Sequence, residues 1–175
     1  NPIVQGDLER FQKQLTGKTF KHVARRAKYL IFHLQPSGYM IAHLRMTGKF
    51  IVCDPIDSPS KYNRVWFNLS SGRLMIFDDV RCFGTLEVYE QLSDSKALNK
   101  LGIEPFSTDL NVNYFKTKVA SSKREVKSIL LDQQIIAGLG NIYVSEILFR
   151  SKISPLRSTD SICDKEWSQI IKYTQ

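Results

Sequence analysis

The sequence predicts an α+β fold, in which an antiparallel β-sandwich or barrel is followed by a helical domain. Between Thr19 and about Tyr89, short apolar runs follow one another without crossover helices, which is typical of an antiparallel sheet fold. After Glu90 the apolar residues recur with the helical period. Hydrophobic residues make up 42% of the chain, so we expect a packed core. We predict two domains, at residues 1–105 and 106–175.

The first predicted domain begins with a short helix at residues 8–15. Leu8, Phe11 and Leu15 lie at helical spacing, and Gly17 ends the pattern. The apolar runs that follow predict strands at residues 28–34, 39–44, 49–53, 65–69, 73–77 and 85–89. Residues rich in Gly, Pro, Ser and Asp separate several of these strands, at 35–38, 54–60 and 70–72, and predict turns or loops there.

The second predicted domain is helical. A short helix at residues 94–100 comes first and ends at Gly102, and residues 105–108 form a linker. Further helices are predicted near residues 110–120, 126–133, 142–151 and 164–173. The sequence contains no internal repeat and no low-complexity tract.

The chain is basic. Lys and Arg number 25 against 17 Asp and Glu, which gives a formal net charge of +8. Such an excess fits a polyanionic partner, because each cation near a phosphate releases a condensed counterion. A basic protein without a nucleic-acid partner is the alternative that composition alone leaves open.

The three cysteines are far apart in the sequence, at Cys53, Cys82 and Cys163. Their spacing predicts no zinc site, and we expect no cofactor in this chain. Their wide separation and odd number argue against a disulfide framework, which favours a reducing cytoplasm. The apolar runs are too short to cross a bilayer, so we expect no membrane partner.

Residues 137–143, Ala-Gly-Leu-Gly-Asn-Ile-Tyr, lie between two predicted helices. Two glycines allow a tight turn with positive φ and leave the backbone uncovered. Asn141 stands where the next helix should begin and is expected to cap it, and amides at a helix start attract phosphate oxygens. A simple turn between two helices is the alternative.

Two further loops are predicted at strand ends. In residues 43–48, His-Leu-Arg-Met-Thr-Gly, Met46 has polar neighbours and could be exposed, or it could belong to the core, with His43 a structural histidine. In residues 78–84, Asp-Asp-Val-Arg-Cys-Phe-Gly, an extended loop would point Arg81 and Phe83 the same way. An exposed cation and aromatic suit contact with a base and insertion between bases. The alternative is an ion pair of Arg81 with Asp79 and a buried Phe83.

Cations gather at two other places. Arg25, Arg26 and Lys28 precede a predicted strand, and a second cluster, before the helix at 126–133, consists of Lys123, Arg124 and Lys127. Each cluster could hold phosphate groups, with Lys28 directed into a cleft. Each could equally be a solvated charged surface.

Together these segments resemble one family. Arg-Arg-Ala-Lys-Tyr-Leu from Arg25, the loops at 43–48 and 79–84, Leu-Gly-Ile-Glu-Pro from Leu101, and the segment at 137–143 occur in one order. That order resembles the bacterial formamidopyrimidine-DNA glycosylases from about Leu15 to Pro155. The sister endonuclease VIII group is similar overall, but the residues of the last two segments are closer to those of the formamidopyrimidine group.

The resemblance implies a β-sandwich joined to a helix–two-turn–helix domain, with damaged double-stranded DNA as the partner. It implies removal of oxidised purines (8-oxoguanine and formamidopyrimidines) and then cleavage of the abasic strand. The damaged nucleotide must leave the stack, and the resemblance assigns the filling of the vacated space to Met46, Arg81 and Phe83. The resemblance also assigns a catalytic role to Lys28, which matches the family's essential lysine beside the flipped sugar and its phosphate. Further expected contacts to DNA are the phosphate-binding His43 and Asn141, and Tyr62, Lys123 and Lys127.

The chain also departs from the family pattern. The family nucleophile is an N-terminal proline followed by glutamate, whereas Pro2 follows Asn1 and precedes Ile3. The opening helix, the first strand and the C-terminal zinc finger of the family are not found in the sequence, so both ends look cut and zinc is expected only in the missing finger of the parent protein. Tyr62 and Arg64 stand where relatives often carry histidines, and Ser128 where they often have proline.

We therefore expect the parent protein to be a bifunctional DNA glycosylase and abasic-site lyase, and this chain alone to be inactive and unstable because of an exposed sheet edge. The alternatives are a non-catalytic protein that binds damaged DNA and an endonuclease VIII-type glycosylase for oxidised pyrimidines. We expect a monomer in the cytoplasm of a bacterium.

Overall fold

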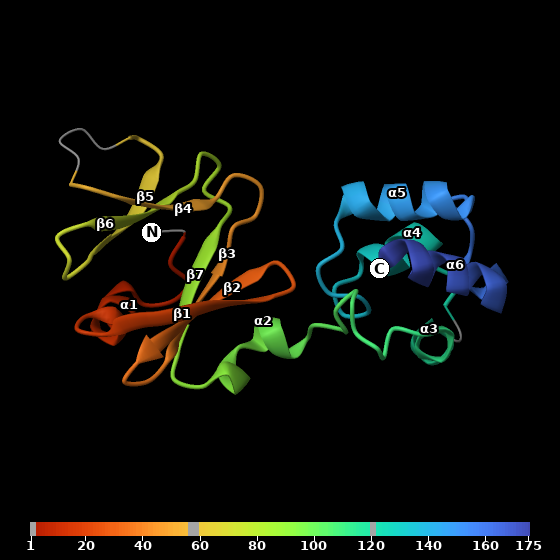
Figure 1. The fold of residues 1–175 in the computed structure, drawn as a ribbon, viewed down its shortest axis with the longest axis horizontal. Coiled ribbons are helices and arrows are strands. Elements are labelled where there is room, and N and C mark those ends of the chain that lie inside the picture. Colours follow the sequence, from red (N-terminus) through yellow and green to blue (C-terminus); the bar gives the residue numbers. More distant parts are fainter. Residues whose placement is uncertain (1–2, 56–59, 120–121) are drawn as a thin grey trace. The chain divides into compact units, whose positions relative to one another are not determined.

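The computed structural model describes residues 3–55, 60–119 and 122–175. The chain forms two compact units, Asn1–Ser95 and Lys96–Gln175. Among the described residues, the first unit holds one α-helix and seven strands, and the second is helical (Figure 1). The α+β class and the order of sheets and helices predicted from the sequence are confirmed.

The first unit is built from two antiparallel sheets. In the larger sheet the strands β1 (Thr19–Arg26), β2 (Tyr29–Gln35), β3 (Tyr39–His43) and β7 (Thr85–Tyr89) lie in that order. In the smaller sheet β6 (Leu74–Asp78) lies between β4 (Lys49–Cys53) and β5 (Asn63–Asn68). Helix α1 (Leu8–Leu15) begins at Asp7, whose carboxylate accepts a hydrogen bond from the Arg10 amide at 2.6 Å.

Aromatic side chains join the two sheets. The rings of Phe32 (β2) and Phe50 (β4) pack edge to face with centroids 4.9 Å apart, and those of Phe20 (β1) and Phe67 (β5) do so at 5.9 Å. Edge-to-face packing adds to the free energy gained by burying such rings. The core between the sheets also contains the fully buried Met40, Phe77 and Leu86, so the first unit is a β-sandwich.

The beginning of the described chain lies against the larger sheet. Val4 pairs with Leu86 of β7 in parallel, and the Gln5 amide donates to the Leu86 carbonyl at 3.0 Å. Ile3 and Val4 are buried in the sandwich core. Residues 3–5 therefore cover part of the sheet edge at β7.

Sequence reasoning missed strand β1 and placed the next strand one residue too early. Arg25 and Arg26 do not precede the sheet but belong to β1, where Arg26 pairs with Tyr29. Ala27 and Lys28 form the turn between β1 and β2, and Ala27 has a φ of 51°. Two-residue turns with positive φ are normally predicted from glycine or asparagine. Alanine stands at this position, so the sequence did not predict the turn.

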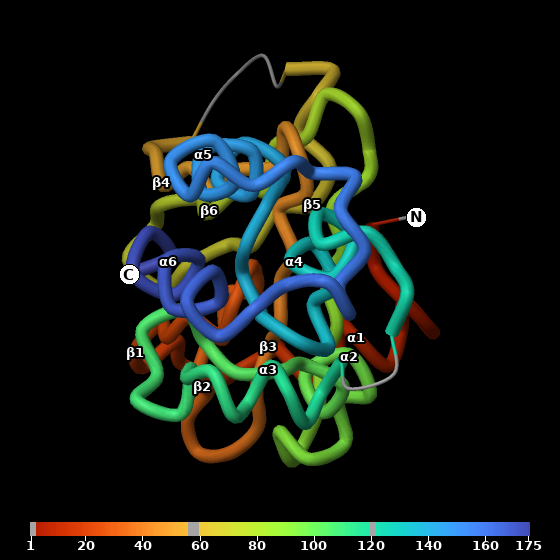
Figure 2. The backbone as a smooth tube through the Cα atoms, turned by 90° about the vertical axis from the view of Figure 1, so that its right-hand side faces the viewer, coloured from red at the N-terminus to blue at the C-terminus, as the bar shows by residue number. Residues whose placement is uncertain are grey.

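The second unit contains α2 (Lys96–Asn99), α3 (Val112–Val119), α4 (Val126–Leu131), α5 (Asn141–Ser151) and α6 (Asp164–Thr174). The helix predicted at 94–100 is divided into a 3₁₀ turn at Leu92–Asp94 and α2. Helices α5 and α6 are neighbours in both backbone views and contact each other (Figures 1 and 2). The core includes Phe115, whose ring stacks on Trp167 at 4.2 Å.

The two units divide between Ser95 and Lys96, before the boundary predicted at residue 105. Residues 102 and 103 are bound to the helical unit: the Gly102 amide donates to the Gln133 carbonyl, and Ile103 pairs with Ile136. A side chain at Gly102 would come within 2.2 Å of the Ile135 carbonyl oxygen. This close packing attaches the segment around Gly102 to the second unit. Across the residues that the structure describes, no helix is long and apolar enough to span a membrane.

Candidate nucleic-acid interface

The loop at residues 44–48 joins β3 to β4 and exposes Met46. The Gly48 amide donates to the Leu44 carbonyl at 2.9 Å, and a side chain at Gly48 would lie 2.5 Å from that oxygen and 2.9 Å from the Phe77 ring. Glycine is therefore required for so tight a loop. Met46 is 72% exposed, which rejects the alternative that it belongs to the core.

The loop at residues 79–84 joins β6 to β7 and exposes Phe83. The prediction that this loop is extended is wrong at Cys82, which has a φ of 56°. Phe83 is nevertheless 58% exposed. Gly84 packs so closely on Phe77 that a side chain there would come within 2.5 Å of the ring. The same buried ring thus supports both loops through a glycine.

Asp79 organises the 79–84 loop from inside the protein. Its side chain is fully buried and accepts hydrogen bonds from the Thr47 hydroxyl, from the Arg81 amide at 3.1 Å and from the Gly84 amide at 2.8 Å. Burial by itself raises the pKa of Asp79, but these hydrogen bonds outweigh it and hold the pKa below its usual value. Asp79 is therefore an ionised buried carboxylate satisfied by loop donors, and no ion pair with Arg81 is needed.

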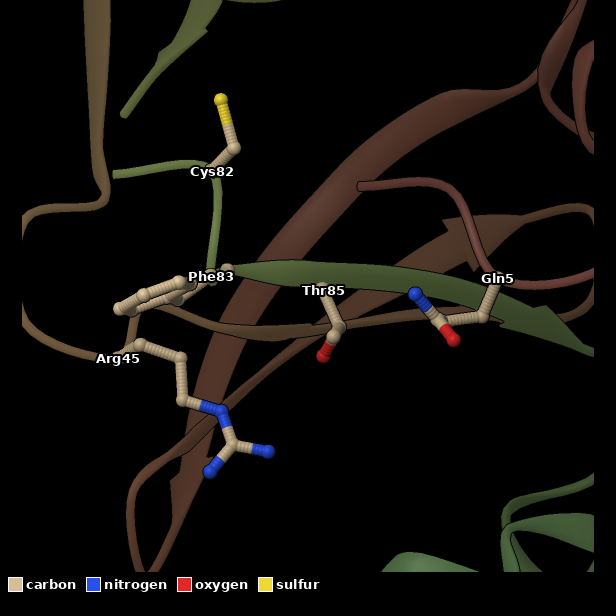
Figure 3. Close-up of a pocket in the computed structure, with 6 residues that line it drawn as sticks. Gln5, Arg45, Cys82, Phe83 and Thr85 are labelled. Atoms are coloured by element: carbon tan, nitrogen blue, oxygen red, sulfur yellow. The ribbon is translucent and has the colours of Figure 1, made fainter. Parts of the chain in front are cut away.

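The two loops meet at their exposed side chains. The Arg81 guanidinium lies 3.0 Å from the Met46 sulfur, so the structure brings together two of the three residues expected to fill the vacated space. Phe83 lines a shallow groove together with Arg45, Thr85 and other residues, and Figure 3 shows its ring beside the Arg45 side chain. The first unit thus presents a sulfur, a cation and an aromatic ring on two adjoining loops.

His43, Lys28 and Arg45 form a second group of polar residues in the first unit. The His43 ring packs edge to face on Tyr29 at 4.8 Å, and its Nδ1 accepts the Arg45 amide at 2.9 Å. Partial burial, Arg45 and Lys28 lower the pKa of His43 to about 4. A neutral imidazole that accepts at Nδ1 carries its proton on Nε2, so His43 can donate to a phosphate oxygen.

Lys28 lies in the turn between β1 and β2 and is exposed. Desolvation, followed by repulsion from Arg45, lowers its pKa. Electrostatic coupling joins Lys28, His43 and Arg45 into one region of positive potential. This arrangement suits an anion.

Tyr62 and Arg64 support the 79–84 loop from β5 and the loop before it. The Tyr62 carbonyl accepts the Asp79 amide at 2.9 Å. The Arg64 guanidinium donates to the carbonyls of Asp79 at 2.7 Å and of Val80 at 3.3 Å. The Arg64 side chain thus holds this backbone, a role that its sequence position did not predict.

The Gly-Leu-Gly turn at residues 138–140 joins α4 to α5 in the second unit. Gly138 has a φ of 104°, as a glycine turn predicts. The Gln133 side chain accepts the Gly138 amide and donates to the Leu139 carbonyl, each at 2.9 Å. The prediction that Asn141 caps the next helix is wrong, because Gly140 is the extended N-cap residue and Asn141 is the first helical residue. The exposed Asn141 is thereby available for a ligand.

The basic cluster before α4 consists of Arg124, whose side chain is bound within the protein, and two lysines. Arg124 is bound to Asp132 at 2.9 Å and to the Ser128 carbonyl at 3.4 Å. Lys123 is exposed and Lys127 is half-buried. The ion pair of Arg124 restrains this segment, which also carries the two lysines.

The predicted residues therefore fall in both units. The first unit holds Lys28, His43, Met46, Tyr62, Arg81 and Phe83, and the second holds Lys123, Lys127 and Asn141. Sequence reasoning missed the supporting roles of Thr47, Asp79, Arg64 and Gln133, although three of them lie in or beside the motifs. Within the described ranges, no cluster of three or more His, Cys, Asp or Glu could hold a metal ion.

The sandwich unit and the helical unit each match a family model of DNA glycosylases. The family model described as "Formamidopyrimidine-DNA glycosylase N-terminal domain" matches residues 1–86, and "Formamidopyrimidine-DNA glycosylase H2TH domain" matches residues 101–175. The chain belongs to the formamidopyrimidine-DNA glycosylase family.

Named relatives agree with this assignment. The chain is 41% identical over 162 residues to the formamidopyrimidine-DNA glycosylase of Oceanobacillus iheyensis (91% of this chain, 58% of the relative). It is 38% identical over 170 residues to that of Streptococcus pneumoniae (96% and 62%). The chain therefore spans about three fifths of the length of these relatives.

Solved structures match as well. The formamidopyrimidine-DNA glycosylase of Lactococcus lactis, non-covalently bound to DNA containing an abasic site, superposes with a TM-score of 0.89 at 34% identity. The match covers 98% of this chain and 66% of that one. The same enzyme in complex with DNA containing the formamidopyrimidine lesion FAPY-dG gives the same TM-score and identity.

Proposed function

We propose that the parent protein is a DNA glycosylase and abasic-site lyase that removes oxidised purines, 8-oxoguanine and formamidopyrimidines, from double-stranded DNA. The observation that carries the proposal is the exposure of Met46 and Phe83 on adjoining loops, with Arg81 against Met46. Exposed apolar side chains that gather on adjoining loops mark a surface where a ligand can bind. Arg81 lies against Met46 and Arg45 lies beside Phe83, and these cations suit a nucleic-acid ligand.

These side chains fit the space that a flipped nucleotide leaves behind. An enzyme that acts on a base in duplex DNA must extrude it, at a cost of lost stacking and pairing. Met46 and Phe83 can restore stacking as apolar wedges, and the Arg81 guanidinium can donate to the unpaired base opposite. The Lactococcus lactis enzyme, which this chain resembles, binds DNA with an abasic site.

The remaining predicted residues suit the sugar–phosphate backbone. The neutral His43 can donate from Nε2, and Lys28 adds a cation near it. In the second unit the exposed Asn141 lies at the start of an eleven-residue helix, where amides favour an oxygen anion. We infer that Lys123, Lys127 and Tyr62 add further backbone contacts.

We infer that the chemistry itself depends on groups outside these 175 residues. The nitrogen of Pro2 is in an amide bond with Asn1, so its lone pair is delocalised and cannot attack the anomeric carbon of the sugar. We expect the zinc-binding finger implied by the resemblance in the remainder of the parent protein. We expect the parent to act as a monomer. Its named relatives are bacterial, so we place it in the bacterial cytoplasm.

Borohydride trapping tests the assignment of the chemistry. The 175-residue chain, mixed with a duplex containing 8-oxoguanine and reduced with borohydride, is expected to give no covalent adduct. The full-length parent protein is expected to give one, because a Schiff base with the sugar forms before strand cleavage. An adduct with the chain alone would overturn the inference that its chemistry lies elsewhere.

Binding to an abasic duplex tests the role of the exposed loops. Met46→Ala and Phe83→Ala are each expected to weaken binding of the chain to a duplex with a tetrahydrofuran abasic analogue about tenfold, since stacking on a base contributes roughly 1–3 kcal/mol. Binding to undamaged duplex should change little. Equal loss on both duplexes would show that these side chains do not fill a vacated space.

The alternative activities give different results in the same assays. A full-length parent protein that binds abasic DNA but forms no adduct would be a non-catalytic damage-binding protein. Excision of an oxidised pyrimidine such as thymine glycol in preference to 8-oxoguanine would indicate an endonuclease VIII-type specificity.

A further inference from the structure

We propose that Asp79 and Thr47 are positioning residues that couple the 44–48 and 79–84 loops, so that Met46 and Phe83 enter the base stack as one unit. The inference rests on the proposed function, which gives the two side chains a common ligand. It goes further because it assigns a role to two residues that make no contact with that ligand themselves.

The link between the loops is a hydroxyl shared by two groups. The Thr47 hydroxyl donates to Asp79 Oδ1 and accepts the Arg81 amide at 3.2 Å. The same carboxylate oxygen also accepts the Arg81 amide at 3.1 Å. Thr47 is the residue directly after Met46, and Arg81 lies two residues before Phe83. A displacement of one loop therefore breaks hydrogen bonds that hold the other.

The remaining carboxylate oxygen fixes the far end of the 79–84 loop. Asp79 Oδ2 accepts the Gly84 amide at 2.8 Å, directly after Phe83. Because the carboxylate is fully buried, it cannot exchange these donors for water without a large cost. One rigid group thus holds the backbone on both sides of Phe83 as well as the residue after Met46.

The sheet brings the two loops to the same place but does not lock their tips. Lys49, the first residue of β4, pairs with Asp78, the last residue of β6. The 44–48 loop precedes this pair and the 79–84 loop follows it, so both loops extend from one end of a two-stranded ladder. Beyond the pair, the contacts through Asp79 and Thr47 and the packing of Gly48 and Gly84 on Phe77 continue the connection.

Such coupling lowers the cost of inserting two side chains into DNA. Each exposed side chain on an independent loop would lose conformational freedom separately on binding, whereas loops that are already joined have lost much of it. We therefore expect the contributions of Met46 and Phe83 to binding to be non-additive, as is found for residues that share a network.

Thr47→Val tests the link with little change of shape, and Thr47→Ser is its matched control, since serine keeps the hydroxyl. In the free chain, amide hydrogen exchange at Arg81 and Gly84 is expected to become about tenfold faster in Thr47→Val, as the loss of one hydrogen bond to a charged group predicts. Thr47→Ser should stay close to wild type. Unchanged exchange in Thr47→Val would overturn the proposed coupling of the two loops, and this test does not depend on DNA.

A double-mutant cycle tests the consequence for binding. With Thr47 present, the Met46→Ala and Phe83→Ala double variant should lose about tenfold less affinity for the tetrahydrofuran duplex than the product of the single losses. In the Thr47→Val background the losses should multiply. Equal non-additivity in both backgrounds would refute the coupling. If the wild-type chain does not prefer abasic to undamaged duplex, the proposed function fails. The exchange experiment still decides whether the two loops are coupled.

Discussion

The 79–84 loop of the first unit and the 138–140 turn of the second are each shaped by one polar side chain, but the two side chains differ in charge. Asp79 holds its loop with an ionised, fully buried carboxylate. Gln133 holds its turn with a neutral, half-buried amide that both donates and accepts. Gly84 allows a close approach to Phe77, whereas Gly138 allows the positive φ of its turn.

The difference corresponds to what each region presents. The loop around Asp79 has amides that point inward, so it needs an acceptor with two oxygens, and it exposes the side chains of Arg81 and Phe83. The turn around Gln133 leads into a helix and exposes Asn141 at the helix start. Under the proposed function, the first region would offer side chains to a base stack, and the second would offer polar groups to a backbone phosphate.

The largest effect is expected for Asp79→Asn. An amide nitrogen would replace one acceptor among three donors, and the free energy of unfolding of the first unit should fall by about 3 kcal/mol, as for the breaking of a buried charged network. The lowered pKa of Asp79 means that its contribution is present above its usual pKa and is lost as the pH falls through the folded value.

The two tryptophans allow this loss to be assigned to one unit. Trp66 lies in β5 of the first unit and Trp167 in α6 of the second. Urea unfolding followed by fluorescence, in chains that keep only one of the two tryptophans, should show the Trp66 transition shifted and the Trp167 transition unchanged. A shift of both transitions would contradict the assignment of Asp79 to the first unit alone.

A smaller effect is expected for Gln133→Leu in the second unit. The Gly138 amide and the Leu139 carbonyl lose their partner, so the Trp167 transition should lose about 1.5 kcal/mol. Gln134→Ala, at the exposed neighbouring position, is the matched control and should change stability little. If both variants behave alike, Gln133 does not support the turn.

Salt dependence compares the two units as DNA contacts. Lys28→Gln in the first unit and Lys127→Gln in the second should each reduce the slope of log affinity against log salt by about one, as for the loss of a phosphate contact. Lys13→Gln, on the exposed face of α1, should leave the slope as it is. A change for only one of the two lysines would confine the backbone contacts to its unit.

The titration of His43 affects stability only in acid, and no effect is expected at neutral pH. Its pKa of about 4 means that the folded chain keeps this imidazole neutral, while the unfolded chain protonates it near 6.5. His43 therefore costs stability as the pH falls from about 6.5 toward 4 and contributes nothing above that window. A nuclear magnetic resonance titration of the ring should show a midpoint near 4 in the free chain, and a midpoint near 6.5 would contradict the burial beside Arg45.

Much of the fold could be predicted from the sequence because it depends on local patterns. Short apolar runs placed most strands to within two residues, and helix α5 began within one residue of the prediction. Strand β1 was not predicted, because the turn that ends it, at Ala27 and Lys28, has no residue typical of turns. The boundary between the two units was placed too late in the chain, because Gly102 is attached to the second unit by long-range contacts with residues 133–136.

For the candidate site, the sequence by itself determined which residues carry the resemblance, including Met46, Arg81 and Phe83. It also determined the loops on which they lie, because strand ends and glycines are local signals. Only the tertiary structure decided that Met46 and Phe83 are exposed and that Thr47 meets Asp79 across 32 positions of the chain. Burial and long-range hydrogen bonds depend on how the sheets pack, and no spacing of residues along the chain encodes that packing.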